Sequence, residues 1–544
     1  MLHNLSPFLK FMPQALVLVL MLGTPASAYT LFRSPGLAPP GKTTLSQWLD
    51  SLTPTESPLD MHVMEPLPGT LVPADAASPV IRWRDDAAKL WLVTMTAGSR
   101  TVCQGLVDKD AWAPGEELWA AIHQAAGNHA VTVRLAGVAP DGRLVSRGRT
   151  SFAVSPDPAG AKIGFLRKRL PFRTAQKNPH DSQVVVGDPA SFGRPRVVVE
   201  DQPVCFNCHA YSLNGKTYGM DMDYKGDKGA YVLVDVKERT VLTDDDVISW
   251  NDYKAPGPAK YSMGLFTCLS PDGRFAASTV GESSAFIMLD DLYFSQMFYP
   301  ATGQIAVHDR QTGTVAPLPG ADDVNLVQTN PSFSPDGSTL AFARAEVRPE
   351  LVRAIHDGVL RRESPAQSIL EANGKYPFRF SLYAVDFNGG KGGRAVPIAG
   401  ASDNGLSNFF PKYSPDGKWL VFTQCKTGLV LQPDSKLVIV PARGGEPRVL
   451  AANTPLMNSW HSWSPNSRWL AFAAKGNSPY TEVYLTHIDE NGQSSPALRL
   501  FRFSHPELAA MVPEFVPVNS VDQHSMELAD PEGAVGKSMA TDGR

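Results

Sequence analysis

The chain of 544 residues has little of several features that usually point to a function. It has only five cysteines, and beyond the close pair Cys205 and Cys208 the other three, Cys103, Cys268 and Cys425, are too scattered for a disulfide framework. We expect each of these three to be a small buried hydrophobic residue. The net charge is only -4, from 50 basic and 54 acidic side chains. The composition therefore gives neither the basic footprint of a nucleic-acid-binding protein nor a polybasic membrane patch.

The sequence also lacks a hydrophobic run long enough to cross a bilayer, which takes about 20 apolar residues. The run ALVLVLMLG (residues 15–23) is short, follows Lys10 and precedes Ala26-Ser27-Ala28. A basic start, a short apolar run and an A-x-A site are typical of a bacterial Sec-type signal peptide. We therefore expect a periplasmic or secreted protein with no transmembrane segment after signal removal. The alternative is an uncleaved membrane anchor.

Glycine (44 residues) and proline (46 residues) are plentiful and recur at intervals. Similar stretches such as FSPDGSTLAFA and YSPDGKWLVFT start at Leu269, Phe333, Tyr413 and Trp463. Proline fixes φ in each turn, aspartate bonds its own backbone and glycine takes the left-handed position, so each stretch predicts a hairpin. A second two-strand pattern follows each one. Four strands per unit, repeated at about 40–60 residues, are typical of β-propeller blades.

Two further segments set the number of blades. AYSLNGKTYGMDMD aligns with the repeat, with Tyr211 on Phe333, and supplies the first blade. VPEFVPVN (residues 512–519) starts a last one, which strands within residues 162–172 and 194–201 could complete. Such a closure removes the free edges of the ring. We expect six blades, with five or seven as alternatives, and an inserted helix within residues 346–370.

The regions outside the repeat have a different pattern of apolar and polar residues. Residues 50–155 alternate apolar and polar residues between turns, which predicts a small immunoglobulin-like or fibronectin-like β-sandwich that serves for packing or docking. The expected fold is therefore all-β. Its predicted parts, in order, are a signal peptide (1–28), a linker (29–49), the sandwich (50–155), a linker with strands closing the propeller (156–204), the propeller (205–520) and a disordered tail (521–544).

Cys205-Phe206-Asn207-Cys208-His209 has the C-x-x-C-H pattern by which c-type haem is attached. Two thioether bonds require two cysteines on one side of the porphyrin, and the adjacent histidine must reach the iron from that side. The pattern predicts one covalent haem c held by Cys205 and Cys208, with His209 as an axial ligand. The alternatives are a redox dithiol, which would need a βαβ setting, a zinc site, which would need two more ligands, and chance.

The second axial ligand is expected to come from another blade, because the inner strands of all blades converge on one mouth of the propeller. We favour Met263, which belongs to the blade next to the haem motif; His461, Met222 and Met457 are the alternatives. His461 aligns with the repeat position of His209, and its other interpretation is a hydrogen-bonded structural histidine. A methionine ligand would raise the reduction potential relative to a second histidine.

The repeated xSPDGxxLxF pattern resembles the propeller of TolB-like proteins, over about residues 205–515. LMNSWHSWSPNSRWLAF and SPYTEVYLTHIDENG are further similar to an exported bacterial family that joins this WD-type propeller to a C-x-x-C-H motif, and whose members are mostly uncharacterised. The resemblance implies the architecture and a haem, and it supplies no substrate. TolB itself is a scaffold that contacts other envelope proteins and has no haem motif.

These observations lead to three hypotheses of different classes. The first is an extracytoplasmic cytochrome that passes single electrons through one haem to a redox partner protein in the cell envelope. The second is a haem enzyme of peroxidase type, although the sequence names no catalytic residues. The third is a non-catalytic TolB-like binding scaffold in the cell envelope.

Overall fold

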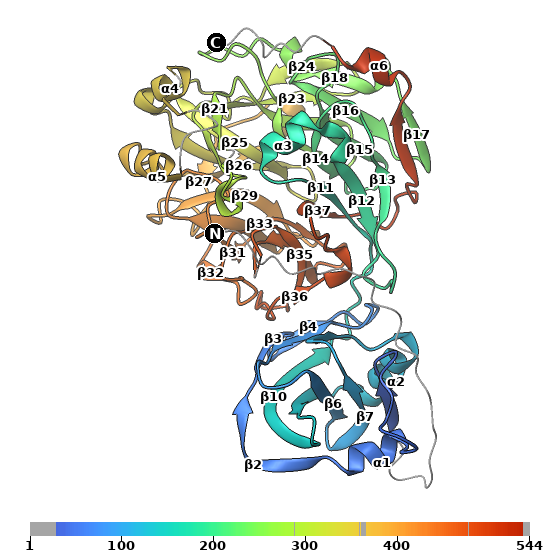
Figure 1. Ribbon diagram of the computed structural model, residues 1–544. Helices are drawn as coiled ribbons and strands as arrows, with labels where there is room; N and C mark the ends of the chain where they lie inside the picture. Colours follow the sequence, from blue (N-terminus) through green and yellow to red (C-terminus); the bar gives the residue numbers. More distant parts are fainter. Residues whose placement is uncertain (1–28, 288, 358, 361–365, 477, 537–544) are drawn as a thin grey trace.

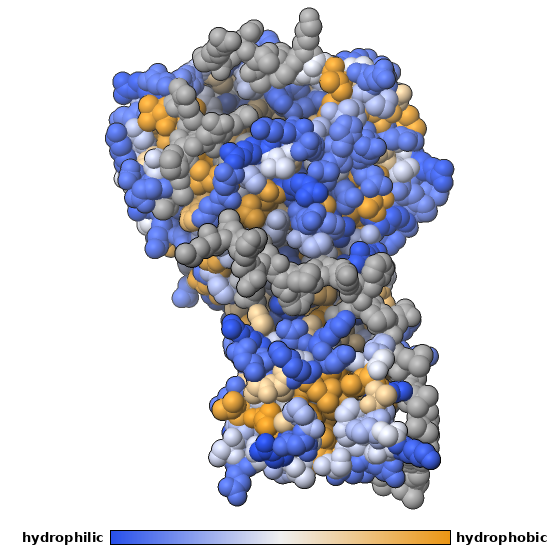
Figure 2. All heavy atoms as spheres, viewed as in Figure 1, coloured by the Kyte–Doolittle hydropathy of each residue, from blue (hydrophilic) through white to orange (hydrophobic). Residues whose placement is uncertain are grey.

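The computed structural model describes residues 29–536 except 288, 358, 361–365 and 477. In Figure 1 the N-terminal β-sandwich lies below the β-propeller. The expected signal peptide, residues 1–28, lies outside the described residues, as do residues 537–544 of the expected tail. Hydrophilic side chains cover most of the propeller face seen in Figure 2.

Within the described residues the propeller has six four-stranded antiparallel sheets, so the predicted six blades are confirmed. From the inner strand outward, the first three blades are β14 (Phe206–Tyr211), β15 (Thr217–Met222), β16 (Ala230–Asp235) and β18 (Val247–Ser249); β19 (Leu265–Leu269), β20 (Phe275–Val280), β23 (Gln304–Asp309) and β24 (Thr314–Pro317); and β25 (Leu326–Phe333), β26 (Thr339–Glu346), β27 (Ser381–Asp386) and β28 (Val396–Pro397). The last three blades are β29 (Ser407–Tyr413), β30 (Trp419–Cys425), β31 (Lys436–Pro441) and β32 (Arg448–Val449); β33 (Asn458–Trp463), β34 (Trp469–Ala474), β35 (Glu482–His487) and β36 (Leu498–Arg499); and β37 (Ala509–Phe515), β11 (Ile163–Lys168), β12 (Gln183–Gly187) and β13 (Arg196–Val199).

The recurring turn chemistry forms each inner hairpin. In blade 3 the Ser334 hydroxyl donates to the Asp336 carboxylate (2.6 Å), which also accepts from the Ser338 backbone N–H (3.0 Å). Gly337 has a φ of 72°, the left-handed conformation that the turn requires. The Ser334 hydroxyl lowers the pKa of Asp336, so this carboxylate is ionised and caps the turn. The same serine–Asx pair stands in blades 1, 2, 4 and 5.

The ring is closed by strands from both ends of the chain. β37 pairs antiparallel with β11, with Phe515 opposite Ile163 and Ala509 opposite Lys168. β11 continues into β12 and β13, so the sixth blade takes its inner strand from the C-terminal side and three strands from before the first repeat. This arrangement leaves no open blade at the junction.

The C-terminal segment is ordered where the sequence predicted disorder. Within residues 521–536, β38 (Ser525–Leu528) pairs in parallel with β17 (Arg239–Leu242), and α6 (Pro531–Ala534) follows. Met526 and Leu528 are buried against blade 1. The prediction was wrong here because the strand is only four residues long and its partner lies far away in the sequence.

The N-terminal unit begins earlier than expected. β1 (Thr30–Arg33) pairs with β7, and α1 (Leu45–Asp50) buries Leu49, so residues 29–49 are not a linker. One sheet has the order β1-β7-β6-β9-β10-β2, with β4 also on β10, and the other has the order β3-β5-β8. A helix that the sequence analysis did not predict, α2 (Glu116–Ala126), packs on the larger sheet. The other bounds are β2 (Thr53–Asp60), β3 (His62–Glu65), β4 (Thr70–Val72), β5 (Ile81–Arg84), β6 (Leu90–Ala97), β7 (Arg100–Val107), β8 (Ala111–Trp112), β9 (Val131–Val138) and β10 (Arg143–Val154).

Three insertions interrupt the blades. α3 (Phe172–Lys177) connects β11 to β12, and α4 (Pro349–His356) and α5 (Ala366–Lys375) lie within blade 3, where a helix was expected. The hairpin of β21 (Ser284–Phe286) and β22 (Phe298–Pro300) lies between β20 and β23 of blade 2. We call residues 281–303, which carry this hairpin, the cap.

Candidate functional site

Each inner strand contains a bulge a few residues before its hairpin turn. In blades 2 to 6 the bulge contains one residue with positive φ, namely Phe266, Asn330, Phe410, Trp460 and Val512. In blade 1 the bulge falls between Phe206 and His209, one residue earlier in the aligned repeat, and Cys208 does not have a positive φ. The propeller therefore departs from its own repeat at the C-x-x-C-H motif.

A cavity of about 380 Å³ lies beside several of these bulges, and we call it the mouth cavity. This volume lies within the range of small-molecule and cofactor sites, about 300–1,000 Å³. Blades 1, 2, 4, 5 and 6 and the cap all contribute to its wall. Among the residues lining it are Cys205, Cys208, Met222, Met263, Phe266 and Trp460.

The two thiols of the motif both line the mouth cavity, and neither is in a disulfide. Burial raises the pKa of Cys208 far above its usual range, so this thiol is neutral. Burial also raises the pKa of Cys205, and the nearby ammonium of Lys168 opposes that shift. The motif thus presents two free thiols to one shared space.

His209 does not line the mouth cavity. Its side chain is buried (3% exposed), packs beside Gly164 of blade 6 and lies 6.2 Å from the Tyr218 ring, centroid to centroid. Neither ring nitrogen makes a hydrogen bond of good geometry, and burial lowers the pKa of the imidazole, an effect that the nearby Gly164 backbone partly opposes. His461, at the aligned position of blade 5, lies with Nε2 3.0 Å from the Val421 carbonyl oxygen. Both rings therefore pack against the second strand of the preceding blade.

The candidates for the second axial ligand separate into two groups. Met263 and Met222 line the mouth cavity with the thiols. Met457 is fully buried in the core between blades 3 and 4 and the cap, and His461 is held by the Val421 carbonyl. The structure therefore brings two of the four candidates to the motif.

The position of Met263 is fixed by a buried carboxyl group. The Met263 backbone N–H donates to Glu282 Oε1 (2.7 Å), and Glu282 belongs to the cap. Burial raises the pKa of Glu282 to about 7. The loop that carries Met263 and the cap are thereby joined beside the cavity.

One part of the wall is polar, which the sequence analysis missed. Lys168 Nζ donates to Asn207 Oδ1 (2.6 Å), and Lys228 forms an ion pair with Asp223. Burial lowers the pKa of Lys168 and raises that of Asp221. These side chains come from β11, β14, β15 and the loop after β15, and apart from Asn207 none of them belongs to a motif in the sequence.

The residues present fit part of a covalent haem site. The apolar space and the two free thiols suit thioether attachment, and the methionines supply a sulfur ligand. The imidazole of His209 does not fit, because it lies outside the lining of the mouth cavity. Among the described residues no group of three or more His, Cys, Asp or Glu side chains is placed to hold a metal ion, so the structure offers no ligand set for the zinc alternative.

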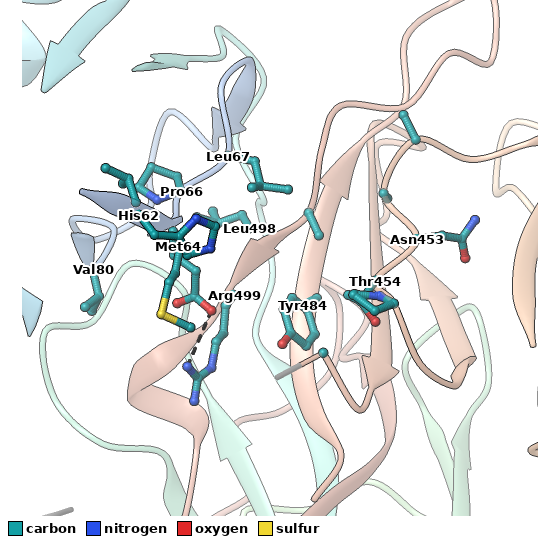
Figure 3. Close-up of a pocket in the computed structure, with 17 residues that line it drawn as sticks. His62, Met64, Pro66, Leu67, Val80, Asn453, Thr454, Tyr484, Leu498 and Arg499 are labelled. Atoms are coloured by element: carbon teal, nitrogen blue, oxygen red, sulfur yellow. Dashed lines mark hydrogen bonds and ion pairs between the residues drawn. The ribbon is translucent and has the colours of Figure 1, made fainter. Parts of the chain in front are cut away.

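A second cavity, of about 210 Å³, lies between the sandwich and blade 5 (Figure 3). In this view His62, Met64 and Pro66 of the sandwich lie on the same side as Arg499, and Tyr484 and Thr454 lie on the other side. Its charged groups are paired: Arg499 bonds Glu482 and lies 3.5 Å from Glu65, which also pairs with Arg82. Nearby, Trp469 Nε1 donates to the Asp157 carbonyl (3.1 Å), and one hydrophobic core runs through both units. We interpret this region as the joint between the two units.

No family model matches the chain, and no curated protein matches it. TolB from Acinetobacter baumannii is similar in structure, with 15% identity over 71% of this chain and 79% of that one and a TM-score of 0.39. Putative TolB from Agrobacterium tumefaciens has 16% identity over 69% and 96% of the two chains and a TM-score of 0.35. An oligogalacturonate lyase in complex with manganese has 13% identity over 62% and 73% and a TM-score of 0.34. This likeness concerns the fold alone.

Among the described residues no helix is long and apolar enough to cross a membrane.

Proposed function

We propose that this protein is an exported binding protein whose ligand site is the mouth cavity of its propeller, and that its ligand there is one haem c attached through Cys205 and Cys208. The observation that carries the proposal is that both thiols of a C-x-x-C-H motif line one largely apolar cavity. Apolar walls exclude water and leave a cofactor's properties to a few placed polar groups.

Each of the lining residues would have its own role in holding the haem. Cys205 and Cys208 would form the two thioethers, and Met263 or Met222 would supply a sulfur ligand from the same cavity. Bound haem would supply one-electron transfer, with a redox partner protein in the cell envelope as the other reactant. Ligation by His209 would require β14 to change its register, because the ring now packs against blade 6.

The position of His209 favours a second candidate, a binding scaffold that holds no haem. In that function the C-x-x-C-H pattern is fortuitous, and His209 fills the same structural position as His461. The propeller then serves as a platform for envelope partners.

Expression in a host with working cytochrome maturation separates the two candidates. We expect wild-type protein to carry covalent haem by stain and by reduced-minus-oxidised spectrum. Cys205→Ala with Cys208→Ala should abolish it, and Cys103→Ala, a free buried cysteine of the sandwich, should not. Wild-type protein without covalent haem would refute the haem proposal and leave the scaffold.

A further inference from the structure

The larger sheet of the sandwich has one face in the core and one face that the chain covers only in part. On the inner face Trp91 and Val93 are buried in the core against which α2 packs. On the outer face α1 covers one part, where Leu49 belongs to the same apolar cluster as Leu106 and Val138. The uncovered part borders a groove of about 590 Å³, which we call the sheet groove.

Three exposed arginines line the sheet groove. Arg149 on β10 lies directly opposite Arg134 on β9, and Arg147 precedes Arg149 by two residues on the same face. Arg147 lies 3.5 Å from the exposed Asp60 carboxylate, whereas Arg134 and Arg149 have no hydrogen bond or ion pair with any residue that the structure describes. Like charges directly opposite each other on neighbouring strands destabilise a sheet. The arrangement therefore has an energetic cost, which an anionic partner would remove.

The spacing of the arginines matches an extended peptide. A strand rises about 3.4 Å per residue, so side chains two residues apart on one face are about 6.8 Å apart. Arg147 and Arg149 have this spacing, and an extended peptide beside β10 presents alternate side chains at the same interval. A carboxylate accepts two parallel hydrogen bonds from one guanidinium group. Leu92 and Ala136, both half-buried, add apolar surface to the groove.

We infer that the sheet groove binds an acidic segment of a partner protein in extended conformation, with carboxylates at alternate residues paired with Arg134, Arg147 and Arg149. The charge complementarity is local, because the chain as a whole has a net charge of -4 and does not attract acidic partners in general. The inference goes beyond the proposed function, since the groove lies in the sandwich and requires neither the mouth cavity nor haem.

Fluorescence anisotropy with labelled peptides tests the inference on the full-length protein. A peptide of alternating glutamate and serine should bind roughly threefold more tightly than one of the same composition with consecutive glutamates, because only alternate side chains face the groove. Binding should weaken as the salt concentration rises. Absent binding of the alternating peptide, or equal binding of the two acidic peptides, would overturn the inference. Binding of inorganic polyphosphate in place of the peptide would assign the groove to an anionic polymer instead.

Paired substitutions then locate the site. Arg134→Gln with Arg149→Gln should weaken the alternating peptide by about tenfold, because it removes two exposed ion pairs. This variant should melt no lower than the wild type, since it also removes a like-charge contact. Arg394→Gln with Arg443→Gln is the matched control, because it removes the same charge from exposed propeller arginines that have no ion pair in the described part of the chain. An equal loss of affinity in both double variants would show that binding follows net charge, and would refute the assignment to the groove.

Discussion

Replacing Phe515 with alanine tests how the propeller ring is held closed. Phe515 is 5% exposed, lies opposite Ile163 in the β37–β11 pair and belongs to the core shared by the sandwich and blades 5 and 6. Truncating a buried phenylalanine to alanine costs about 3–5 kcal/mol. A loss of about 4 kcal/mol corresponds to a roughly thousandfold rise in the open fraction of the sixth blade.

Native-state hydrogen exchange measures that opening directly, since protection reports the free energy of local unfolding. We expect the β11 amides to lose about a thousandfold of protection in Phe515→Ala, whereas the β26 amides in blade 3, across the ring, change far less. Val518→Ala, at a site that is 65% exposed a few residues on, is the control and should change neither. If β11 keeps its protection in Phe515→Ala, the closure is not held by this strand.

Three further predictions concern other parts of the chain. Arg499→Met should lower the free energy of unfolding by about 3–5 kcal/mol in chemical denaturation, because it leaves the buried Glu482 carboxylate unpaired while Glu65 keeps Arg82, and Arg443→Met, outside this network, should not. Truncation after Gln523 should lower the melting temperature measurably, because it removes β38 and its buried Met526, whereas truncation after residue 536 should retain the contacts of the described segment. Asp522, whose pKa Arg196 lowers to about 2, has a folded pKa below its ordinary value of 3.8. Its contribution is present above about pH 4 and lost as the pH falls toward 2, so the stability difference between wild type and Asp522→Asn should shrink from pH 6 to pH 2.5.

The propeller could be predicted because its information is local and repeated. Each hairpin carries its own turn residues, such as the Ser334–Asp336 pair, so each blade can be recognised from about a dozen residues of sequence. The closing strand was recognisable because residues 512–519 repeat the start of a blade. β38 was not, because its pairing with β17 joins segments 286 residues apart in the sequence and the strand is only four residues long. A pairing of this kind forms only between segments that the completed ring brings together, so no local sequence pattern predicts it.

The site could be predicted only as far as its motif. Cys205, Cys208 and Met263 were named from the sequence and all line the mouth cavity, while the role of each remains a prediction. Gln296 and Trp460, which also line the mouth cavity, carried no signal, because neither belongs to a recognisable motif in the sequence.

The side chain of His209 shows how a repeat and a motif can make opposite demands on one residue. The repeat places position 209 beside the preceding blade, where His461 packs in blade 5, and the haem motif requires the same imidazole to face the cavity. On a strand adjacent side chains point to opposite faces, so Cys208 and His209 cannot both face the cavity without a bulge between them. In blade 1 the bulge lies at residues 207–208, one residue earlier than elsewhere, and both thiols face the cavity while the histidine keeps the repeat position. The early bulge therefore lets both cysteines of the motif face the cavity while His209 keeps the position that the repeat gives it.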